Sequence, residues 1–163
     1  MESLLRTSRL WAWGSVVTAA ACAWALALGP VATTRAQATG VIEVSISGFK
    51  GNEGRAHITL YGSEDTWLKI PKALQTLQRP IPEGVLKVKF EGLAPGDYAV
   101  SVIHDANEND ELDMRWFPFP KPKEGAGASR DPKTKMGPPK WKDSKISLAA
   151  GEAKHIEIHV AYF

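Results

Sequence analysis

The chain has 163 residues, with 20 lysines and arginines, 18 aspartates and glutamates, one cysteine and 44% hydrophobic residues. That length suits a single domain. The composition excludes a collagen-like chain, a wholly disordered chain and a small protein stapled by internal disulfides. It indicates an ordinary folded domain, but it does not indicate a reaction.

The first 38 residues have the pattern of a secretory signal peptide. Two arginines precede an apolar run over residues 10–28, and the small-residue tripeptide Ala-Gln-Ala follows at residues 36–38. We therefore expect cleavage after residue 38. Residues 39–163 would then form a single domain in the periplasm or outside a bacterial cell.

Two other interpretations of this segment stay open. The apolar run is nearly long enough to remain as a membrane anchor, and Cys22 follows three alanines that faintly resemble a lipoprotein box. After cleavage no span would remain, and seventeen basic and seventeen acidic residues would be left once Arg6, Arg9, Arg35 and Glu2 are removed. A neutral chain gives no reason to expect nucleic-acid binding.

Short stretches of alternating apolar and polar residues indicate half-buried β-strands. These stretches are residues 42–47, 56–61, 86–91, 146–148 and 155–162. Residues 97–103 are apolar on both faces, so we expect this strand in the centre of a sheet. Only residues 65–78 have the pattern of a short helix. Six or seven strands without intervening helices predict an all-β fold, an antiparallel β-sandwich.

Residues 114–140 contain six prolines, which excludes a central strand there. We expect one long ordered loop, because apolar aromatic side chains could anchor it. Four of them are candidates for contact with a peptide or a sugar, namely Trp116, Phe117, Phe119 and Trp141. Such aromatics also close the open end of a sandwich, and this alternative stays open.

An acidic loop directly follows the predicted central strand. Oxygen-bearing side chains occupy loop positions 1, 3, 5 and 9, and a backbone carbonyl would add position 7: Asp105, Asn107, Asn109, Asp113 and Glu111. Calcium takes about six to eight oxygen ligands, and EF-hand loops offer them at this spacing. The match is partial, because position 6 is Asp110 instead of glycine and position 12 is Trp116 instead of glutamate. We expect weak calcium binding; the alternative is a turn whose carboxylates cap backbone N–H groups.

Several motifs occur together in this chain. They are Pro95-Gly96-Asp97-Tyr98, His104-Asp105-Ala106-Asn107 with Asn109 and Leu112-Asp113, Pro120-Lys121-Pro122-Lys123-Glu124-Gly125, Pro138-Pro139-Lys140-Trp141-Lys142-Asp143, and the strand at 156–162. In this combination the chain resembles the DUF2141 family of bacterial secreted proteins. The resemblance covers nearly all of the predicted domain and implies an immunoglobulin-like or transthyretin-like sandwich, but no activity.

The chain departs from the family pattern at two places. The family usually has glycine near Asp110, and it usually has aromatic residues where this chain has Ala126 and Ala128. The first difference makes an ion site less expected, because the loop lacks the glycine that favours its turn. The second difference makes any surface built by aromatic residues smaller in this chain.

No nucleophile elbow, Cys–His pair, phosphate loop or zinc-ligand cluster is visible in the sequence. His57 has no partner that the sequence can name, and we expect His104 to be structural. We therefore expect a noncatalytic exported module, in which a calcium loop orders residues 114–140 for contact with a protein or a glycan. The alternatives are a structural envelope protein without an ion site, and an enzyme whose site is built from loops.

Overall fold

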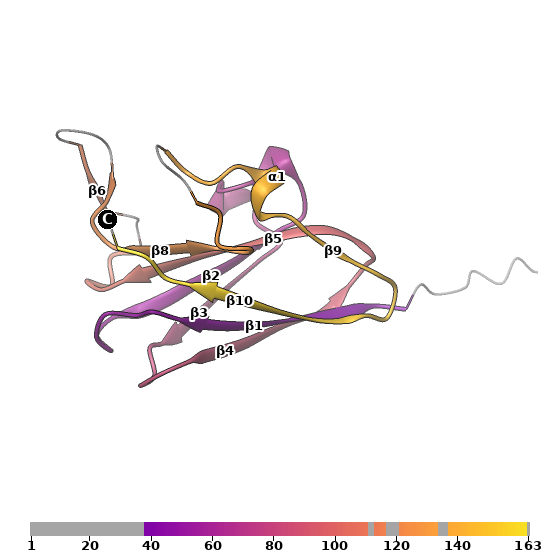
Figure 1. Ribbon diagram of the computed structural model, residues 1–163, viewed down its shortest axis with the longest axis horizontal. Helices are drawn as coiled ribbons and strands as arrows, with labels where there is room; N and C mark the ends of the chain where they lie inside the picture. Colours follow the sequence, from indigo (N-terminus) through magenta and orange to yellow (C-terminus); the bar gives the residue numbers. More distant parts are fainter. Residues whose placement is uncertain (1–37, 111–112, 117–120, 134–136, 163) are drawn as a thin grey trace, which may run out of the picture. The chain divides into compact units, whose positions relative to one another are not determined.

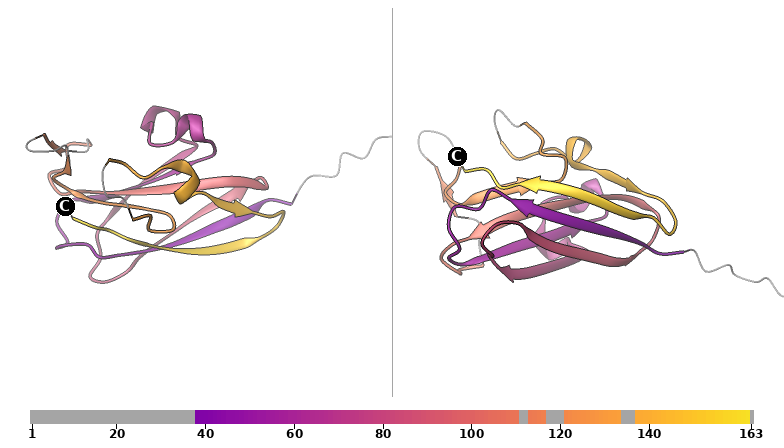
Figure 2. Two further views of the ribbon diagram at one scale, coloured as in Figure 1. Left: turned by 45° about the horizontal axis from the view of Figure 1, so that its top comes forward. Right: turned by 60° about the horizontal axis from the view of Figure 1, so that its bottom comes forward.

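A computed structural model describes residues 38–110, 113–116, 121–133 and 137–162. Over these residues the protein consists mainly of two β-sheets packed face to face, as Figures 1 and 2 show. The predicted all-β sandwich is therefore confirmed.

The smaller sheet has three strands in the order β10-β1-β4, which are Ala153–His159, Gly40–Ser47 and Leu86–Leu93. The larger sheet has the order β3-β2-β5-β8, which are Gln75–Pro80, Arg55–Tyr61, Gly96–Asp105 and Gly125–Ala128. Strand β9, Ile146–Leu148, pairs with the beginning of β5. The short elements are η1 (Glu64–Thr66), η2 (Ile70–Lys72), β6 (Met114–Arg115), β7 (Lys121–Pro122) and α1 (Trp141–Ser144).

One strand pair departs from the expected antiparallel arrangement. Strands β1 and β10 run parallel, from Val41 opposite Ala153 to Ser47 opposite His159. The first and last strands of the sandwich are therefore neighbours, and the smaller sheet is mixed. Strand β5 has partners on both sides, which confirms its predicted central place.

The helix expected over residues 65–78 is not formed. Two 3-10 turns occupy its first part, and residues from Gln75 onward belong to β3. Strand β3 is the edge strand of its sheet, and only Leu77 in it is partly buried. Because almost no side chain of β3 enters a core, the alternation that marks a strand is missing from its sequence.

The segment expected as a long loop contains a regular strand. Strand β8 pairs with β5 from Ser101 opposite Ala128 to His104 opposite Gly125. No proline falls inside β8, because Pro122 precedes it and Pro132 follows it. The exclusion of a central strand holds, because β8 lies at the edge of the larger sheet. Among the described residues of the expected loop, only residues 125–128, which contain no proline, form a strand of this sheet.

Two apolar clusters hold the sandwich together. The main core lies between the sheets and is built by alternating side chains of β1, β2, β4, β5 and β10, among them Ile42, Val44, Ile46, Ile58, Leu60, Val88, Phe90, Val100, Val102 and Ile158. A second cluster lies on the opposite, outer face of the larger sheet, where Tyr61, Ala99 and Trp141 are buried and Trp67 packs against them. Segment α1 thus covers one end of that outer face.

Glycine is required where β8 meets the end of the chain. A Cβ atom added at Gly125 would lie 2.5 Å from Cζ of Tyr162 and 2.6 Å from Cγ1 of Val160. Neither side chain is free to retreat, because Val160 is buried and the hydroxyl of Tyr162 contacts the ring of His104 and accepts a hydrogen bond from the Lys50 N–H.

We predict that Gly125→Ala lowers the free energy of unfolding by about 1–3 kcal/mol, because it overpacks this contact. The measurement is urea unfolding, and Gly96→Ala is the matched control. A Cβ atom at Gly96 would meet only one atom, at 3.9 Å. The control should change the stability by no more than about 0.5 kcal/mol. Equal effects of the two substitutions would contradict the assignment of Gly125 to a close contact.

Candidate functional site

The candidate site lies at the other end of the outer face from Trp141. In the larger sheet His57 of β2 stands between Gln78 of β3 and Ile103 of β5, and Asp105 is paired with Arg55. Side chains two residues apart on one strand share a face. The register therefore brings His57, Gln78 and Asp105 to the same end of the same face, next to the acidic loop.

Asp105 ends β5 and organises the loop that follows. It is 1% exposed, and its Oδ1 and Oδ2 accept hydrogen bonds from the backbone N–H groups of Asn109 and Asp110, at 3.2 and 2.9 Å. Burial would raise the pKa of this carboxyl group. The backbone N–H groups of Asp110 and Asn109, helped by nearby His57, outweigh that effect and lower the pKa of Asp105. The carboxylate is thus held in its charged form.

The turn of the loop depends on two residues with left-handed backbone conformation. Glu108 has φ of 56° and Asp110 has φ of 61°. Asp110 stands at loop position 6, where an EF-hand has glycine for the same turn. Aspartate tolerates this conformation better than most residues do, and so the missing glycine does not prevent the loop from closing.

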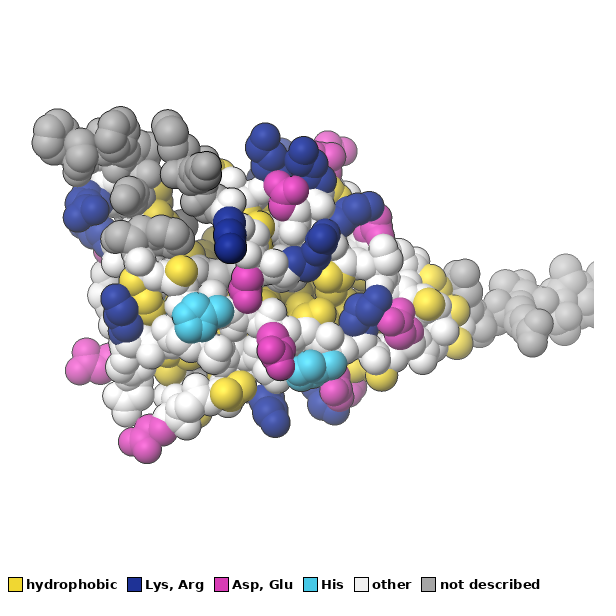
Figure 3. Space-filling view, viewed as in Figure 1, with side chains coloured by type: hydrophobic (Ala, Val, Ile, Leu, Met, Phe, Trp, Pro, Cys, Tyr) yellow, Lys and Arg dark blue, Asp and Glu magenta, His cyan; other side chains and the backbone are white. Residues whose placement is uncertain are grey.

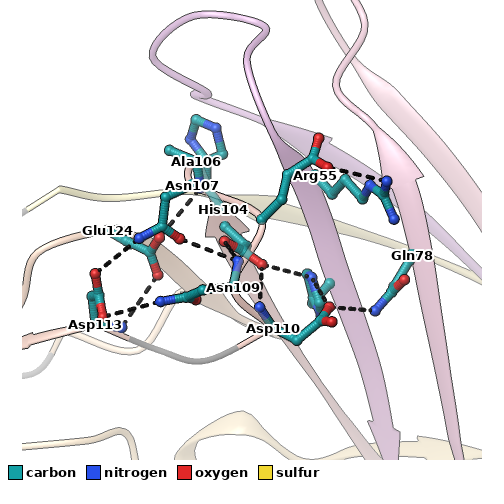
Figure 4. Close-up of polar contacts among 12 residues, drawn as sticks. Arg55, Gln78, His104, Ala106, Asn107, Asn109, Asp110, Asp113 and Glu124 are labelled. Atoms are coloured by element: carbon teal, nitrogen blue, oxygen red, sulfur yellow. Dashed lines mark hydrogen bonds and ion pairs between the residues drawn. The ribbon is translucent and has the colours of Figure 1, made fainter.

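Four of the five predicted calcium ligands lie together. Oδ1 of Asn107 accepts a hydrogen bond from the Asn109 N–H at 3.3 Å. The side-chain amides of Asn107 and Asn109 donate to Oδ2 and Oδ1 of Asp113, at 3.2 and 3.4 Å. Figure 4 shows these three side chains turned toward one another. The fifth, Glu111, lies outside the described residues.

Glu124 fastens both ends of the loop. It stands just before β8, is 8% exposed, and accepts hydrogen bonds from the backbone N–H groups of Ala106 at Oε1 (3.2 Å) and Asp113 at Oε2 (3.3 Å). This role of Glu124 was not predicted from the sequence, because the spacing of side chains within the loop gives no information about a residue eleven positions after Asp113. Only the pairing of β8 with β5 places Glu124 here.

His104 faces the other side of the sheet from Asp105. Its Nδ1 contacts the hydroxyl of Tyr162, and its Nε2 lies 2.9 Å from the carbonyl oxygen of Glu53. Phe49 packs against its ring edge-on. His104 is therefore structural, as expected, and it ties the turn before β2 to the end of the chain.

His57 is a site residue that the sequence did not reveal. Its Nε2 lies 3.2 Å from Oδ2 of Asp105 and 3.5 Å from Oδ1 of Asp110, to which the Gln78 side-chain amide donates at 2.9 Å. The Nε2 atom is buried but makes no hydrogen bond, because its direction does not meet either oxygen with hydrogen-bond geometry. An unsatisfied buried polar atom costs about 1–3 kcal/mol. A ligand that met this nitrogen would remove that cost.

The expected aromatic contact surface is only partly present. Trp116, just after β6, is 74% exposed, whereas Trp141 is 8% exposed and belongs to the second apolar cluster. The Trp141 prediction is corrected by this position, because α1 turns its side chain under Trp67. Phe117 and Phe119 lie outside the described residues.

Around α1, Figure 3 shows many basic side chains with acidic ones among them, and Lys140 and Lys142 are exposed there.

Among the described residues, no helix is long and apolar enough to cross a membrane. The apolar run at 10–28 and Cys22 lie outside the described residues. Of the predicted cleavage site at residues 36–38, only residue 38 is described.

The fold and this loop define the class of protein: a small β-sandwich with an acidic, Asx-rich loop at the end of its central strand. The chain belongs to the DUF2141 family, described as uncharacterised proteins conserved in bacteria, whose model matches residues 44–157. No match was found among curated proteins or among solved structures.

We predict that Asp105→Asn lowers the free energy of unfolding by about 2–3 kcal/mol near neutral pH with a chelator present, because it weakens two charge-assisted hydrogen bonds. The folded-state pKa is lowered below the unfolded value of about 3.9. The stabilisation is therefore present above that pH and is lost as the pH falls through the folded-state pKa. Urea unfolding at a series of pH values should show the difference between wild type and variant shrinking in acid.

The control for this prediction is Asp65→Asn, which removes the same charge from an exposed position in η1. It should change the stability near neutral pH by no more than about 0.5 kcal/mol. An Asp105→Asn protein as stable as the wild type would show that the carboxylate does not hold the loop.

Proposed function

We propose that this protein is a noncatalytic β-sandwich module exported to the bacterial envelope, whose loop at 105–113 binds calcium. Bound calcium would order the adjoining segment at 114–140, which contacts a protein or a glycan. The signal-peptide pattern of residues 1–38 supports export. The convergence of the loop side chains carries the proposal for calcium.

The loop has the hydrogen bonds that a calcium loop needs before it binds an ion. The residue at position 1 accepts from the N–H groups of positions 5 and 6, and the side chains at positions 3, 5 and 9 meet on one side of the turn. The side chains of Asn107, Asn109 and Asp113 are therefore already in contact, and a rotation of the two amide groups would turn their oxygen atoms toward an ion. Less chain has to be ordered on binding when the ligands are preorganised in this way.

The charge of the loop also favours a cation. Asp105, Asp110 and Asp113 bring three carboxylates into one turn, and the nearby guanidinium group of Arg55 is paired with Glu108 at 3.1 Å. Like charges at short distance raise each other's energy. A divalent ion among them would remove this repulsion.

Asp113 connects the loop to the proposed contact segment. Its carbonyl oxygen accepts a hydrogen bond from the N–H of Lys123 at 2.8 Å, next to the short β6–β7 ladder. Trp116 follows β6 directly and is exposed. An ion held by the Asp113 side chain would therefore fix the base of the hairpin that carries Trp116.

We predict that calcium raises the melting temperature of the protein. For a dissociation constant of about 1 mM, about 10 mM calcium stabilises the fold by about 1.4 kcal/mol. That corresponds to about 4–6 °C for a domain of this size. The measurement is thermal melting followed by circular dichroism, with calcium and with a chelator.

Asp113→Ala should abolish the calcium shift, because it removes a ligand and leaves the Asp105 hydrogen bonds in place. Asp65→Ala, an equal change of charge in η1, should keep the shift. No shift in the wild type, or the same shift in Asp113→Ala, would remove the calcium proposal.

We also predict that calcium slows tryptic cleavage within residues 114–140. Cleavage of a folded protein requires local opening, and the open population falls when an ion binds the closed state. The rate should fall several-fold for the wild type and stay constant for Asp113→Ala, as followed by mass spectrometry of the fragments. Cleavage equally fast with and without calcium would mean that the loop does not order the segment.

A further inference from the structure

We propose a second metal site on the outer face of the larger sheet, in which His57, Asp105 and Asp110 bind a divalent transition-metal ion of the zinc class. One nitrogen and two carboxylate oxygens from these residues all lie within 4.8 Å of one another. The proposal does not depend on calcium binding, although Asp105 takes part in both sites.

The distances fit a metal ion. Zinc binds nitrogen and oxygen ligands at about 2.0–2.2 Å in tetrahedral geometry, so two ligands of one ion lie about 3.4 Å apart. The Nε2 atom of His57 lies 3.2 Å from Oδ2 of Asp105 and 3.5 Å from Oδ1 of Asp110. Both separations are those of neighbouring ligands in one coordination shell.

The buried nitrogen of His57 is the observation that points to a ligand. His57 is 9% exposed, and its Nε2 atom is buried without a hydrogen bond although two carboxylates lie beside it. A buried ring nitrogen normally has a hydrogen-bond partner. A metal ion between the ring and the two carboxylates would meet the nitrogen lone pair and both negative charges at once.

The donor set selects the class of metal. Imidazole suits zinc, copper, nickel and iron, whereas calcium and magnesium prefer oxygen ligands alone. Three protein ligands leave a position for water, or for the side chain of Gln78, which contacts Asp110. The site is also accessible, because the Asp110 side chain is 70% exposed.

The surrounding contacts hold the ligands in place. The backbone N–H of Asp110 donates to Oδ2 of Asp105, and the amide of Gln78 donates to Oδ1 of Asp110. His57 lies on β2, which is hydrogen-bonded on both sides. Fixed outer contacts of this kind orient metal ligands and raise affinity.

The two sites use opposite sides of Asp105. Its Oδ1 atom accepts the N–H of Asn109, whereas its Oδ2 atom accepts the N–H of Asp110 and lies 3.2 Å from Nε2 of His57. The other ligands differ: Asn107, Asn109 and Asp113 belong to the calcium site, and His57 and Asp110 belong to the transition-metal site. Each site can therefore be removed without substituting a ligand of the other.

The test is isothermal titration calorimetry of the purified protein with zinc after treatment with a chelator. We expect one zinc ion per chain, and binding weakened by about 100-fold in His57→Gln and also in Asp110→Asn. His155→Gln is the matched control and should bind like the wild type, because His155 also lies beside a carboxylate, Glu157 at 3.9 Å, but on an exposed strand face. Cobalt offers a second measurement, since its visible absorption should appear in the wild type and disappear in His57→Gln.

Circular dichroism separates loss of binding from loss of folding, and the exposed Asp110 side chain makes Asp110→Asn the safer variant. Asp113→Ala should keep zinc binding while losing the calcium shift, and His57→Gln should keep the calcium shift. Zinc binding that is unchanged in both His57→Gln and Asp110→Asn would overturn the proposal. So would its loss in Asp113→Ala, because the ion would then belong to the loop.

Discussion

The hydrogen bonds from the loop backbone to the buried carboxylate of Asp105 are the interaction on which the candidate site depends. Asp105 is the last residue of β5, and its place is fixed because that strand is paired on both sides. The N–H groups of Asn109 and Asp110 can reach it only when the chain turns sharply through Glu108 and Asp110. The carboxylate of Asp105 thus fixes the loop to the end of the sheet, and the loop in turn positions Asn107, Asn109, Asp110 and Asp113.

The fold was predictable where a strand buries a row of apolar side chains. The alternation in the sequence located β1, β2, β4, β9 and β10, and the run at 97–103, which is apolar on both faces, located β5. Strand β3 was not predicted, because an edge strand with one partly buried side chain has no alternation of apolar and polar residues. The parallel pairing of β1 with β10 was not predicted either. It joins segments more than a hundred residues apart, and the residue pattern of a strand does not show which strands pair with it.

The candidate site divides in the same way. That Asp105, Asn107, Asn109 and Asp113 lie together was predictable, because side chains at alternate positions of one turn are brought together by local geometry alone. The remaining contacts depend on register. His57 reaches Asp105 only because β2 pairs with β5 as it does, and Glu124 reaches the loop only because β8 lies beside β5. Pairing β2 with β5 as antiparallel neighbours would have placed His57 beside Asp105, but the residues near His57 in the sequence do not determine the register of that pairing.

Strand β8 determines which side chains stand at the polar end of the outer face. Gly125 and Gly127 point inward, where side chains of β10 and the residues after it leave no room for a Cβ atom. Ala126 and Ala128 therefore point outward, beside Ile103 and Ser101 and on the same face as His57 and Asp105. With alanine at both positions, β8 places no large side chain beside the cluster of His57, Asp105 and Asp110.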